Sequence, residues 1–341
     1  MTVLAARRAY EGANGRFAAE ERWQGVRILR VWHTGFGKGA RWRRGADFAS
    51  FYAACAGRLL RMGRFERVIA MTTPPLISCL GAALVRLRGG RLCLWLMDLN
   101  PDQAIAAGWL REGSRAARAL ERCLAWSLEA AGAVVVLDRF MRERILARGV
   151  EESKVAVVPP WAHDDAVRYE EEGRRWFRRE HGLEGKFVVM YSGNHSPCHP
   201  LDTLLEAARA VAHRPEIAFC FAGGGSEFGK VQRVAREAGL GNIVTLPYQP
   251  LERLSAALSA ADLHVVVMGD AFVGIVHPCK IYNVLRLGIP FLYIGPPRSH
   301  VADLAPEAAE GTWAGLARHG DVRSVAAQIV RAAALGPRRY E

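Results

Sequence analysis

The sequence predicts an α/β protein built from two doubly wound domains, each organised around a parallel sheet. Three observations support this prediction. The chain has 341 residues, more than one hydrophobic core usually organises, so two domains are expected. Short β-branched runs alternate with longer amphipathic stretches, as in open α/β folds. Several short runs are continuously apolar, which is typical of strands buried on both faces of a parallel sheet.

The expected strands are the short apolar runs in chain order. They lie at 2–5, 26–31, 67–71, 92–97, 133–137, 155–158, 187–191, 217–221, 243–246, 263–267 and 290–294. Stretches with a helical period lie between them and predict helices near 46–62, 114–130, 138–147, 201–212, 226–238, 250–260, 280–287 and 322–334.

A break in this alternation suggests where the domains divide. Pro159 and Pro160 end a strand, and the stretch 169–179 is dense in charge. We therefore predict an N-terminal domain at 1–160, a linker at 161–185 and a C-terminal domain at 186–341. Two such domains would leave a cleft outside the carboxyl ends of their strands, where folds of this kind bind ligands.

Composition narrows the class of protein. Half of the residues are hydrophobic and 23% are charged, which excludes a disordered or fibrous chain. The apolar stretches stop well short of the roughly 18 residues that a membrane helix needs, and no secretory signal is evident. Seven cysteines are scattered without a Cys-x-x-Cys pair, which argues against a disulfide framework or a cysteine-rich zinc site. We expect a cytoplasmic protein.

The net charge of +12 is concentrated in the first half of the chain. Residues 1–160 contain 26 Lys and Arg against 14 Asp and Glu, whereas residues 161–341 contain 20 of each. This asymmetry suggests that the first half meets something anionic, either a membrane surface or a nucleic acid. A general preference for arginine explains it equally well.

A glycine-rich turn, Gly223-Gly224-Gly225, follows the expected strand 217–221. From Gly224 the sequence matches G-x-x-x-x-G-K, but Val231 stands where a P-loop needs a Ser or Thr hydroxyl for magnesium. A true P-loop is therefore not expected. The turn either brings backbone N–H groups to a diphosphate at a helix N-terminus or is a tight turn with a purely structural role.

A second glycine, Gly193, follows the expected strand 187–191 and gives a ligand close access to the backbone. The polar loop then enters a helix that begins near Asp202. His195, Cys198 and His199 are potential metal ligands, but three ligands within five residues rarely form a tetrahedral site unaided. We expect this loop to contact a phosphate or a sugar rather than zinc.

Lys280 lies in the first turn of the expected helix 280–287, where its charge opposes the helix dipole. A bound anion would remove that conflict, and an exposed surface lysine is the alternative. In the first half, Asp98 directly follows an apolar strand, so its carboxylate either accepts a hydrogen bond from a substrate or caps the next turn.

These segments together resemble the GT-B glycosyltransferases of family 4, and most closely the bacterial branch that builds O-antigen and colanic-acid-type polysaccharides. The resemblance rests on a Gly-Asn step before a helix ending in Asp-Thr-Leu-Leu-Glu-Ala, the glycine-rich turn, the run Asn-Ile-Val-Thr-Leu-Pro-Tyr-Gln-Pro, and a Pro-x-Lys-Ile-Tyr-Asn helix closed by Gly-x-Pro. These features span 193–207, 223–225, 242–250 and 278–290. Asp98 to Pro101 and Thr73 to Pro75 resemble two further motifs of that branch.

The resemblance implies a GT-B fold, in which the C-terminal domain holds a nucleotide-diphosphate sugar and the N-terminal domain receives a lipid-linked or saccharide acceptor. Such hexosyltransferases are usually retaining and need neither metal nor cofactor, and the lack of an Asp-x-Asp motif agrees. Arginines that flank the expected helix 46–62, together with Trp42, suggest a peripheral attachment of the basic first half to the inner face of the cell membrane. No nucleic-acid partner is expected.

Site residues follow from the same resemblance. Lys280, His199 and Asp98 are expected to take part in catalysis. Thr73 and Asn100 are expected on the acceptor side. Residues expected to bind the donor are Gly193, Asn194, Gly223, Gly224, Gly225, Tyr248, Asp270, Gly274, Pro278, Cys279 and Asn283.

The sequence departs from the family at three places. His199 stands where the family often has Lys or Arg, so we expect a pH-dependent charge there. Ile275 and Asn283 occupy the positions of two glutamates of the broader family, which implies a changed ribose or sugar contact. The chain also begins at what looks like the family's second strand.

Three functions are consistent with these features. A glycosyltransferase is the leading interpretation. A non-catalytic relative or partner subunit is the alternative, because the expected opening strand and loop are missing. A sugar-nucleotide 2-epimerase of the same architecture fits the segments less well.

Overall fold

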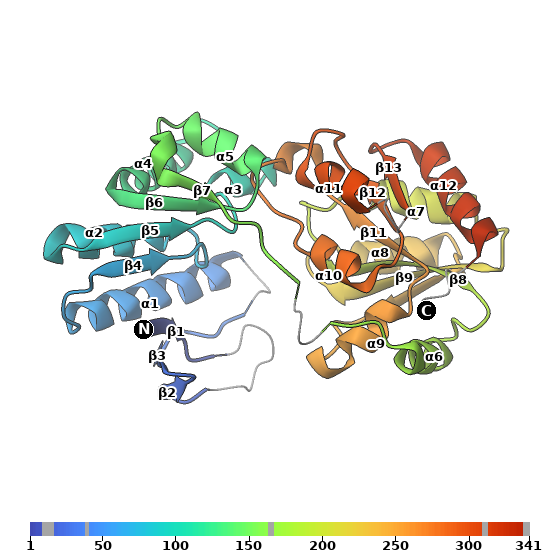
Figure 1. Cartoon of the computed structure of the whole chain (residues 1–341), viewed down its shortest axis with the longest axis horizontal. Coiled ribbons are helices and arrows are strands. Elements are labelled where there is room, and N and C mark those ends of the chain that lie inside the picture. Colours follow the sequence, from blue (N-terminus) through green and yellow to red (C-terminus); the bar gives the residue numbers. More distant parts are fainter. Residues whose placement is uncertain (9–16, 38–40, 163–166, 309–312, 337–341) are drawn as a thin grey trace. The chain divides into compact units, whose positions relative to one another are not determined.

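The computed structural model describes residues 1–8, 17–37, 41–162, 167–308 and 313–336. Within them the chain forms two compact α/β units, whose elements are labelled in Figure 1. Met1–Leu96, Glu112–Val135 and Val150–Ala156 make up the first unit, and Met97–Arg111, Val136–Gly149 and Val157–Glu341 make up the second. The domain limits expected from the sequence stay a prediction.

The strands of the first unit form two sheets. In the smaller sheet, β1 (Thr2–Ala6) runs parallel to β3 (Val26–Val31), and β2 (Glu20–Trp23) runs antiparallel to the other side of β3. The larger sheet has the order β4-β5-β6-β7. Its strands are β4 (Arg67–Ala70), β5 (Arg91–Trp95), β6 (Ala131–Val136) and β7 (Val155–Val157). β1 and β4 are thus edge strands.

Helices α1 (Arg41–Leu60), α2 (Ser78–Arg88) and α4 (Arg115–Ala130) belong to the first unit. On α1, Cys55 is buried and Leu59 is partly buried, as expected for the inward face of an amphipathic helix. Ser114 caps the start of α4, because its hydroxyl accepts a hydrogen bond from the Ala117 N–H at 3.1 Å and so satisfies a free donor of the first turn.

The second unit has one sheet in the order β10-β9-β8-β11-β12-β13, with parallel neighbours. Its strands are β8 (Phe187–Asn194), β9 (Ile217–Gly224), β10 (Ile243–Leu246), β11 (Leu263–Val267), β12 (Phe291–Ile294) and β13 (Ala314–Ala317). Connections leave β8 toward β9 and leave β11 toward β12, so the strand order reverses between β8 and β11. Ligands of doubly wound folds bind at this kind of reversal.

Helices cover both faces of this sheet. Val189 and Tyr191 point into the cluster made with α7 (Asp202–Ala210), α8 (Phe228–Glu237) and α12 (Val322–Leu335), whereas Val188 and Met190 point to the opposite face. Helices α6 (Glu171–Glu180), α9 (Leu254–Ser259) and α10 (Lys280–Leu287) cover that face. Burial on both faces explains the continuous apolar runs, and the predicted fold class is confirmed.

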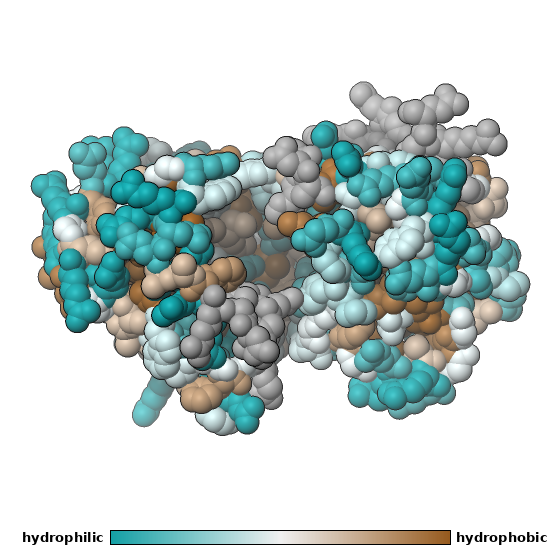
Figure 2. Space-filling view, turned by 90° about the horizontal axis from the view of Figure 1, so that it is seen from below, coloured by the Kyte–Doolittle hydropathy of each residue, from teal (hydrophilic) through white to brown (hydrophobic). Residues whose placement is uncertain are grey.

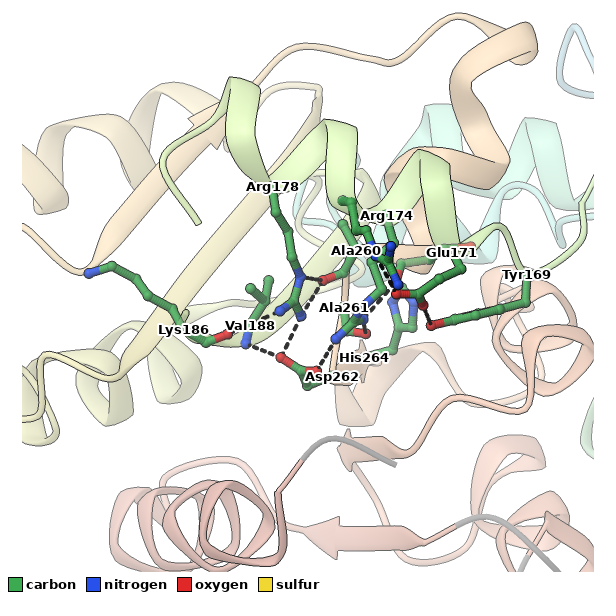
Figure 3. Close-up of polar contacts among 12 residues, drawn as sticks. Tyr169, Glu171, Arg174, Arg178, Lys186, Val188, Ala260, Ala261, Asp262 and His264 are labelled. Carbon is green, nitrogen blue, oxygen red and sulfur yellow. Dashed lines mark hydrogen bonds and ion pairs between the residues drawn. The ribbon is translucent and has the colours of Figure 1, made fainter. Parts of the chain in front are cut away.

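A buried ion network fastens α6 to this sheet (Figure 3). The Asp262 carboxylate accepts from Arg178 at 2.6 Å, from the Val188 N–H at 2.7 Å and from Arg174. Arg174 also donates to the Ser259 and Ala261 carbonyls, and Arg178 to that of Ala260. Because each charge meets charged or polar partners, the network can lie in the interior.

Some elements were not expected from the sequence. The predicted linker contains α6, and α2, β2 and β13 lie where no element was predicted. β2 reads Glu-Glu-Arg-Trp and is exposed throughout, so it lacks the apolar alternation of a half-buried strand. α6 is dense in charge because its interior face carries arginines.

The remaining short elements are α3 (Asp102–Ala106), α5 (Arg139–Leu146), α11 (His300–Ala308) and the 3₁₀ turns η1 (Glu152–Lys154), η2 (Leu251–Arg253) and η3 (Asp270–Phe272). Among the described residues, none of the helices has the length and apolarity to cross a membrane.

Candidate active site

The loops after β8, β9 and β11 converge in the second unit. The loop after β8 carries His195 and His199, the glycine-rich turn ends β9 and starts the loop that follows, and the chain after β11 leads to Lys280 at the start of α10. β8 pairs with both β9 and β11, so these loops leave the sheet side by side. The carboxyl-end location expected from the sequence is therefore where the structure gathers these residues.

Glycines allow the first two loops to lie against each other. Gly223 has a φ of 137°, and a Cβ there would lie 2.0 Å from the Gly193 carbonyl oxygen. Gly225 has a φ of 130°, and its Cβ would lie 2.3 Å from the His195 carbonyl oxygen. Any other residue would force the loops apart as well as strain the backbone. These glycines therefore keep backbone groups close together at the strand ends.

Lys280 is the main electrostatic feature of the site. Its Nζ atom is buried 3.7 Å from the centre of the Tyr191 ring and has no hydrogen-bond partner within the described part of the chain. A Cβ on Gly193 would lie 3.2 Å from this Nζ, so Gly193 leaves the room that the ammonium group occupies. Burial lowers the pKa of Lys280 to about 7. The Lys280 side chain is therefore only partly charged near pH 7 in the free protein.

Two buried histidines lie beside this lysine. His195 Nδ1 lies 3.0 Å from the Gly193 carbonyl oxygen, and His199 Nδ1 lies 2.7 Å from that of Val267. Burial, and secondarily the Lys280 charge, lowers the pKa of His195 to about 4 and that of His199 to about 3. His199 is therefore neutral at pH 7, and the expectation that it titrates near neutrality is wrong.

The ring nitrogens also bear on the zinc site considered from the sequence. Because a carbonyl only accepts, both Nδ1 atoms must donate, which leaves Nε2 of each ring with a lone pair. Cys198 lies in the same loop, and its Sγ contacts the Gln103 amide at 3.9 Å. Within the described residues, the one cluster with metal-ligand spacing is a different set, Asp138, His277 and His300.

A pocket of about 180 Å³ opens at the ends of β8 and β9. Residues with donor-binding or catalytic roles expected from the sequence line it: Gly193, Gly223, Tyr248, Lys280 and Asn283. Sequence reasoning missed other lining residues: Ser192, Ala222, Gln249, Leu254, Leu258, His264, Val265 and Val284. Most of the missed residues are ordinary core types, so no sequence signal marks them. The Tyr248 hydroxyl donates to the Gly224 carbonyl at 3.1 Å and closes one wall.

Other expected site residues do not line this pocket: Asn194, Gly224, Gly225, His199, Asp270, Gly274, Pro278 and Cys279. Gly274 has a φ of 69°, and a Cβ there would lie 2.6 Å from the Phe140 carbonyl oxygen. This glycine lets the loop before α10 approach α5. It therefore shapes the loop that carries Lys280.

Asp98 belongs to the second unit, next to that loop. It forms an isolated antiparallel bridge with Val276, and the Leu99 N–H donates to the Ile275 carbonyl at 2.8 Å. Burial raises the pKa of Asp98 to about 6, against the opposing effect of His277. Asn100 lies in the same segment and donates to the Gln103 side chain at 3.4 Å. Thr73 lies in the first unit, where it is exposed.

The arrangement at Lys280 suits an anion. A buried ammonium without a partner has lost its hydration and regains an electrostatic partner when an anion enters. The glycine-rich loop ends bring backbone groups within reach of the same space. The pocket therefore offers a buried amine and backbone groups to a ligand that carries negative charge.

Comparison with known sequences gives the family context. Residues 1–161 match the glycosyl transferase 4-like domain, and residues 174–277 match glycosyl transferases group 1. The putative colanic acid biosynthesis glycosyl transferase WcaI of Escherichia coli K12 is 27% identical over 250 residues, 70% of this chain and 59% of that protein. The probable glycosyltransferase WbjE of Pseudomonas aeruginosa is 23% identical over 251 residues, 74% of this chain and 62% of that protein. The chain thus spans less than two thirds of either relative.

Solved structures agree on the fold. Sucrose-phosphate synthase from Thermosynechococcus elongatus superimposes with a TM-score of 0.71 and 16% identity, over 98% of this chain and 79% of that one. HepE from Anabaena, solved with UDP-glucose, superimposes with a TM-score of 0.66 and 14% identity, over 90% of this chain and 76% of that one. At sequence identities this low, the two superpositions support a shared fold and nothing further. The sequence matches and the shared architecture together place this chain in the group 1 glycosyltransferases of family 4, which have the GT-B fold.

Proposed function

We propose that this protein transfers a sugar from a nucleotide-diphosphate sugar to a lipid-linked or saccharide acceptor in the synthesis of a cell-surface polysaccharide. The observation that carries the proposal is the buried, unpartnered Lys280 beside the pocket at the ends of β8 and β9. In this proposal the second unit binds the donor, with its diphosphate at Lys280 and its nucleoside between Tyr248 and Asn283.

The chemistry of transfer supports this placement of the diphosphate. Negative charge grows on the diphosphate as the bond to the sugar breaks, so a fixed cation stabilises the transition state more than the bound substrate. The ammonium group would supply there what a magnesium ion supplies in other enzymes. We therefore propose a metal-independent hexosyltransferase that retains the anomeric configuration, in which Asp98 faces the reacting sugar and Thr73 and Asn100 contact the acceptor.

A donor screen tests the proposal. UDP-, GDP-, dTDP- and ADP-sugars would be added separately, and the thermal unfolding midpoint recorded. One nucleotide class should raise the midpoint of the wild-type protein, and this rise should be absent in Lys280→Met. Lys230→Met is the matched control, because Lys230 pairs with Asp202 at 2.6 Å on the surface of the same unit. Loss of the rise in the control, or its persistence in Lys280→Met, would contradict the placement.

Turnover separates the alternatives. Release of nucleoside diphosphate that depends on added lipid-linked acceptor and survives EDTA would support transfer. Conversion of the nucleotide sugar to an isomer without acceptor would instead indicate a 2-epimerase. Donor binding without any conversion would favour a non-catalytic partner subunit.

We also propose that the first unit attaches to an anionic membrane surface. Trp42 and Leu60, near the two ends of α1, are 66% and 67% exposed, and the Arg43 guanidinium lies 5.5 Å from the Trp42 ring. Figure 2 shows one face, on which hydrophobic and hydrophilic residues are interspersed over the described surface of this unit. Basic residues near an anionic leaflet contribute about 1 kcal/mol each, and aromatic side chains favour the interface.

Vesicle sedimentation tests this attachment. The protein should pellet with anionic vesicles, lose that binding at high salt, and stay in solution with neutral vesicles. Arg43→Glu with Arg44→Glu should weaken pelleting, whereas Arg233→Glu with Arg236→Glu on α8 should not. Equal pelleting with both kinds of vesicle would contradict the proposal.

A further inference from the structure

A cluster of metal-ligand side chains lies away from the lining of the donor pocket. Asp138, His277 and His300 each offer a ligand atom, and these atoms lie within 4.8 Å of one another. The rings of His277 and His300 lie beside each other in a tilted arrangement, with centroids 4.0 Å apart and an angle of 38° between their planes. Asp138 and His277 are buried, and His300 is partly buried.

The Tyr282 hydroxyl contacts the same ring nitrogen, Nε2, of both histidines. It lies 3.0 Å from Nε2 of His277 and 2.9 Å from Nε2 of His300. A tyrosine oxygen can accept from both Nε2–H groups at once. In that arrangement the lone pairs of both rings are on Nδ1, the ligand atoms left for an ion.

The carboxylate completes the set. Asp138 Oδ2 lies 2.8 Å from Nδ1 of His277, while Oδ1 accepts from the Met141 N–H at 2.8 Å and caps α5. An ion between Oδ2 and Nδ1 would replace one hydrogen bond by two coordinate bonds and leave the helix cap intact. A shift of the His277 proton from Nδ1 to Nε2 is sufficient, so no proton need leave the cluster.

We infer that Asp138, His277 and His300 bind one divalent transition-metal ion of the Zn²⁺ class, with the Tyr282 hydroxyl orienting the two imidazoles through their Nε2 atoms. Two imidazole nitrogens and a carboxylate suit zinc and its neighbours rather than calcium or magnesium, which prefer oxygen ligands alone. A hydrogen bond to the outer ring nitrogen is the usual way in which proteins orient a ligating histidine.

The ion would join elements that are far apart in the chain. Asp138 caps α5, His277 precedes α10 and His300 begins α11. Metal binding should therefore cross-link these three elements, and it should stabilise the folded chain because the ion binds the folded state and not the unfolded one. This role does not depend on the transfer reaction, because no metal is assigned to the donor pocket.

Zinc titration of the EDTA-treated full chain tests the inference. In competition with a chromophoric chelator, the wild-type protein should bind one Zn²⁺ at this site, and excess Zn²⁺ should raise its thermal unfolding midpoint. His300→Gln should abolish this binding. Tyr282→Phe should weaken it about 10–100-fold, the usual effect of losing a group that orients a ligating histidine. Asp138→Asn removes the charged oxygen of a direct ligand and should weaken binding more than Tyr282→Phe does. Asparagine still caps α5, so this variant should remain folded.

Other histidines and the thiols provide the controls. His199→Gln and Cys198→Ser change the metal-ligand residues of the donor loop and should leave the zinc stoichiometry and affinity unchanged. The inference is overturned if His277→Gln combined with His300→Gln, verified as folded by circular dichroism, binds Zn²⁺ as the wild-type protein does. It is equally overturned if the wild-type protein shows neither binding nor a rise in the unfolding midpoint.

Discussion

Two groups of buried cations in the second unit illustrate opposite uses of charge. Arg174 and Arg178 share the Asp262 carboxylate and donate further to backbone carbonyls. Lys280 has a buried Nζ that lies against the Tyr191 ring and meets no acceptor among the described residues. The first group is satisfied within the protein, which identifies it as structural. The second has no such partner, and this is why we propose it as an anion-binding group.

The largest effect is expected from breaking the satisfied group. Asp262→Asn removes the charge that compensates both arginines and leaves them buried, so the free energy of unfolding should fall by about 3–5 kcal/mol. Urea denaturation followed by circular dichroism measures this loss. Glu171→Gln is a suitable control, because Glu171 pairs with Arg175 on the exposed side of α6. A loss below about 1 kcal/mol, typical of a surface pair, would show that the network is not structural.

Removing the unsatisfied cation should have the reverse pattern. Lys280→Met should leave the free energy of unfolding unchanged or raise it, because the cost of burying an ammonium disappears. The activation free energy of sugar transfer should nevertheless rise by about 2–4 kcal/mol, the usual effect of removing one donor that stabilises the transition state. Measured kcat and stability of this variant should thus move independently. A stability loss as large as that of Asp262→Asn would remove the distinction between the two groups.

The pH dependence sharpens the comparison. Burial lowers the pKa of Lys280 to about 7 in the free protein, and a bound diphosphate should raise it. The free-energy cost of burying the charged ammonium is fully present below pH 7. It decreases as the pH rises from 7 toward 10.5, the pKa of lysine in the unfolded chain. The free energy of unfolding of the free protein should therefore increase over that range. Donor affinity should change in the opposite sense, weakening by up to about tenfold per pH unit above 7.

Calorimetry at pH 7.5 and 8.5 in buffers of different ionisation enthalpy would measure both the affinity and the proton uptake on binding. Lys280→Arg is the control, because a guanidinium keeps its charge across this range and should remove the pH dependence. A dissociation constant of the wild-type protein that stays constant between the two pH values would contradict the pKa assignment.

The smallest effect is expected at His199. Its pKa of about 3 keeps the ring neutral, and its Nδ1–H is already used on the Val267 carbonyl. His199→Gln retains a donor, so kcat should fall by less than about tenfold and by the same factor at pH 6 and pH 8, a modest cost of the order of one neutral hydrogen bond. A loss confined to pH 6 would show instead that His199 acts as a cation.

The expected fold was predictable where local pattern and burial coincide. β3, β10, β11 and α10 have the predicted limits, because runs rich in β-branched and apolar residues and a Gly288 helix end are local signals. α6 was not predicted, because its inward face carries Arg174, whose burial depends on Asp262, 88 residues later in the chain. From sequence alone, a segment as rich in charged residues as α6 resembles a solvated linker, because the acidic partner that allows its arginines to be buried is distant in the chain.

The sequence by itself determined the α/β class and the family, and it indicated the loops after β8, β9 and β11 as the place of the candidate site. Local signals suffice for these features, because glycines, strand ends and a first-turn lysine are read directly from residue order. Only the tertiary structure decided the charge states, because desolvation depends on which side chains enclose Lys280 and His199. The tertiary structure also places Asp138 next to His277 and His300. These residues follow Asp138 by more than a hundred positions, so only packing brings them together.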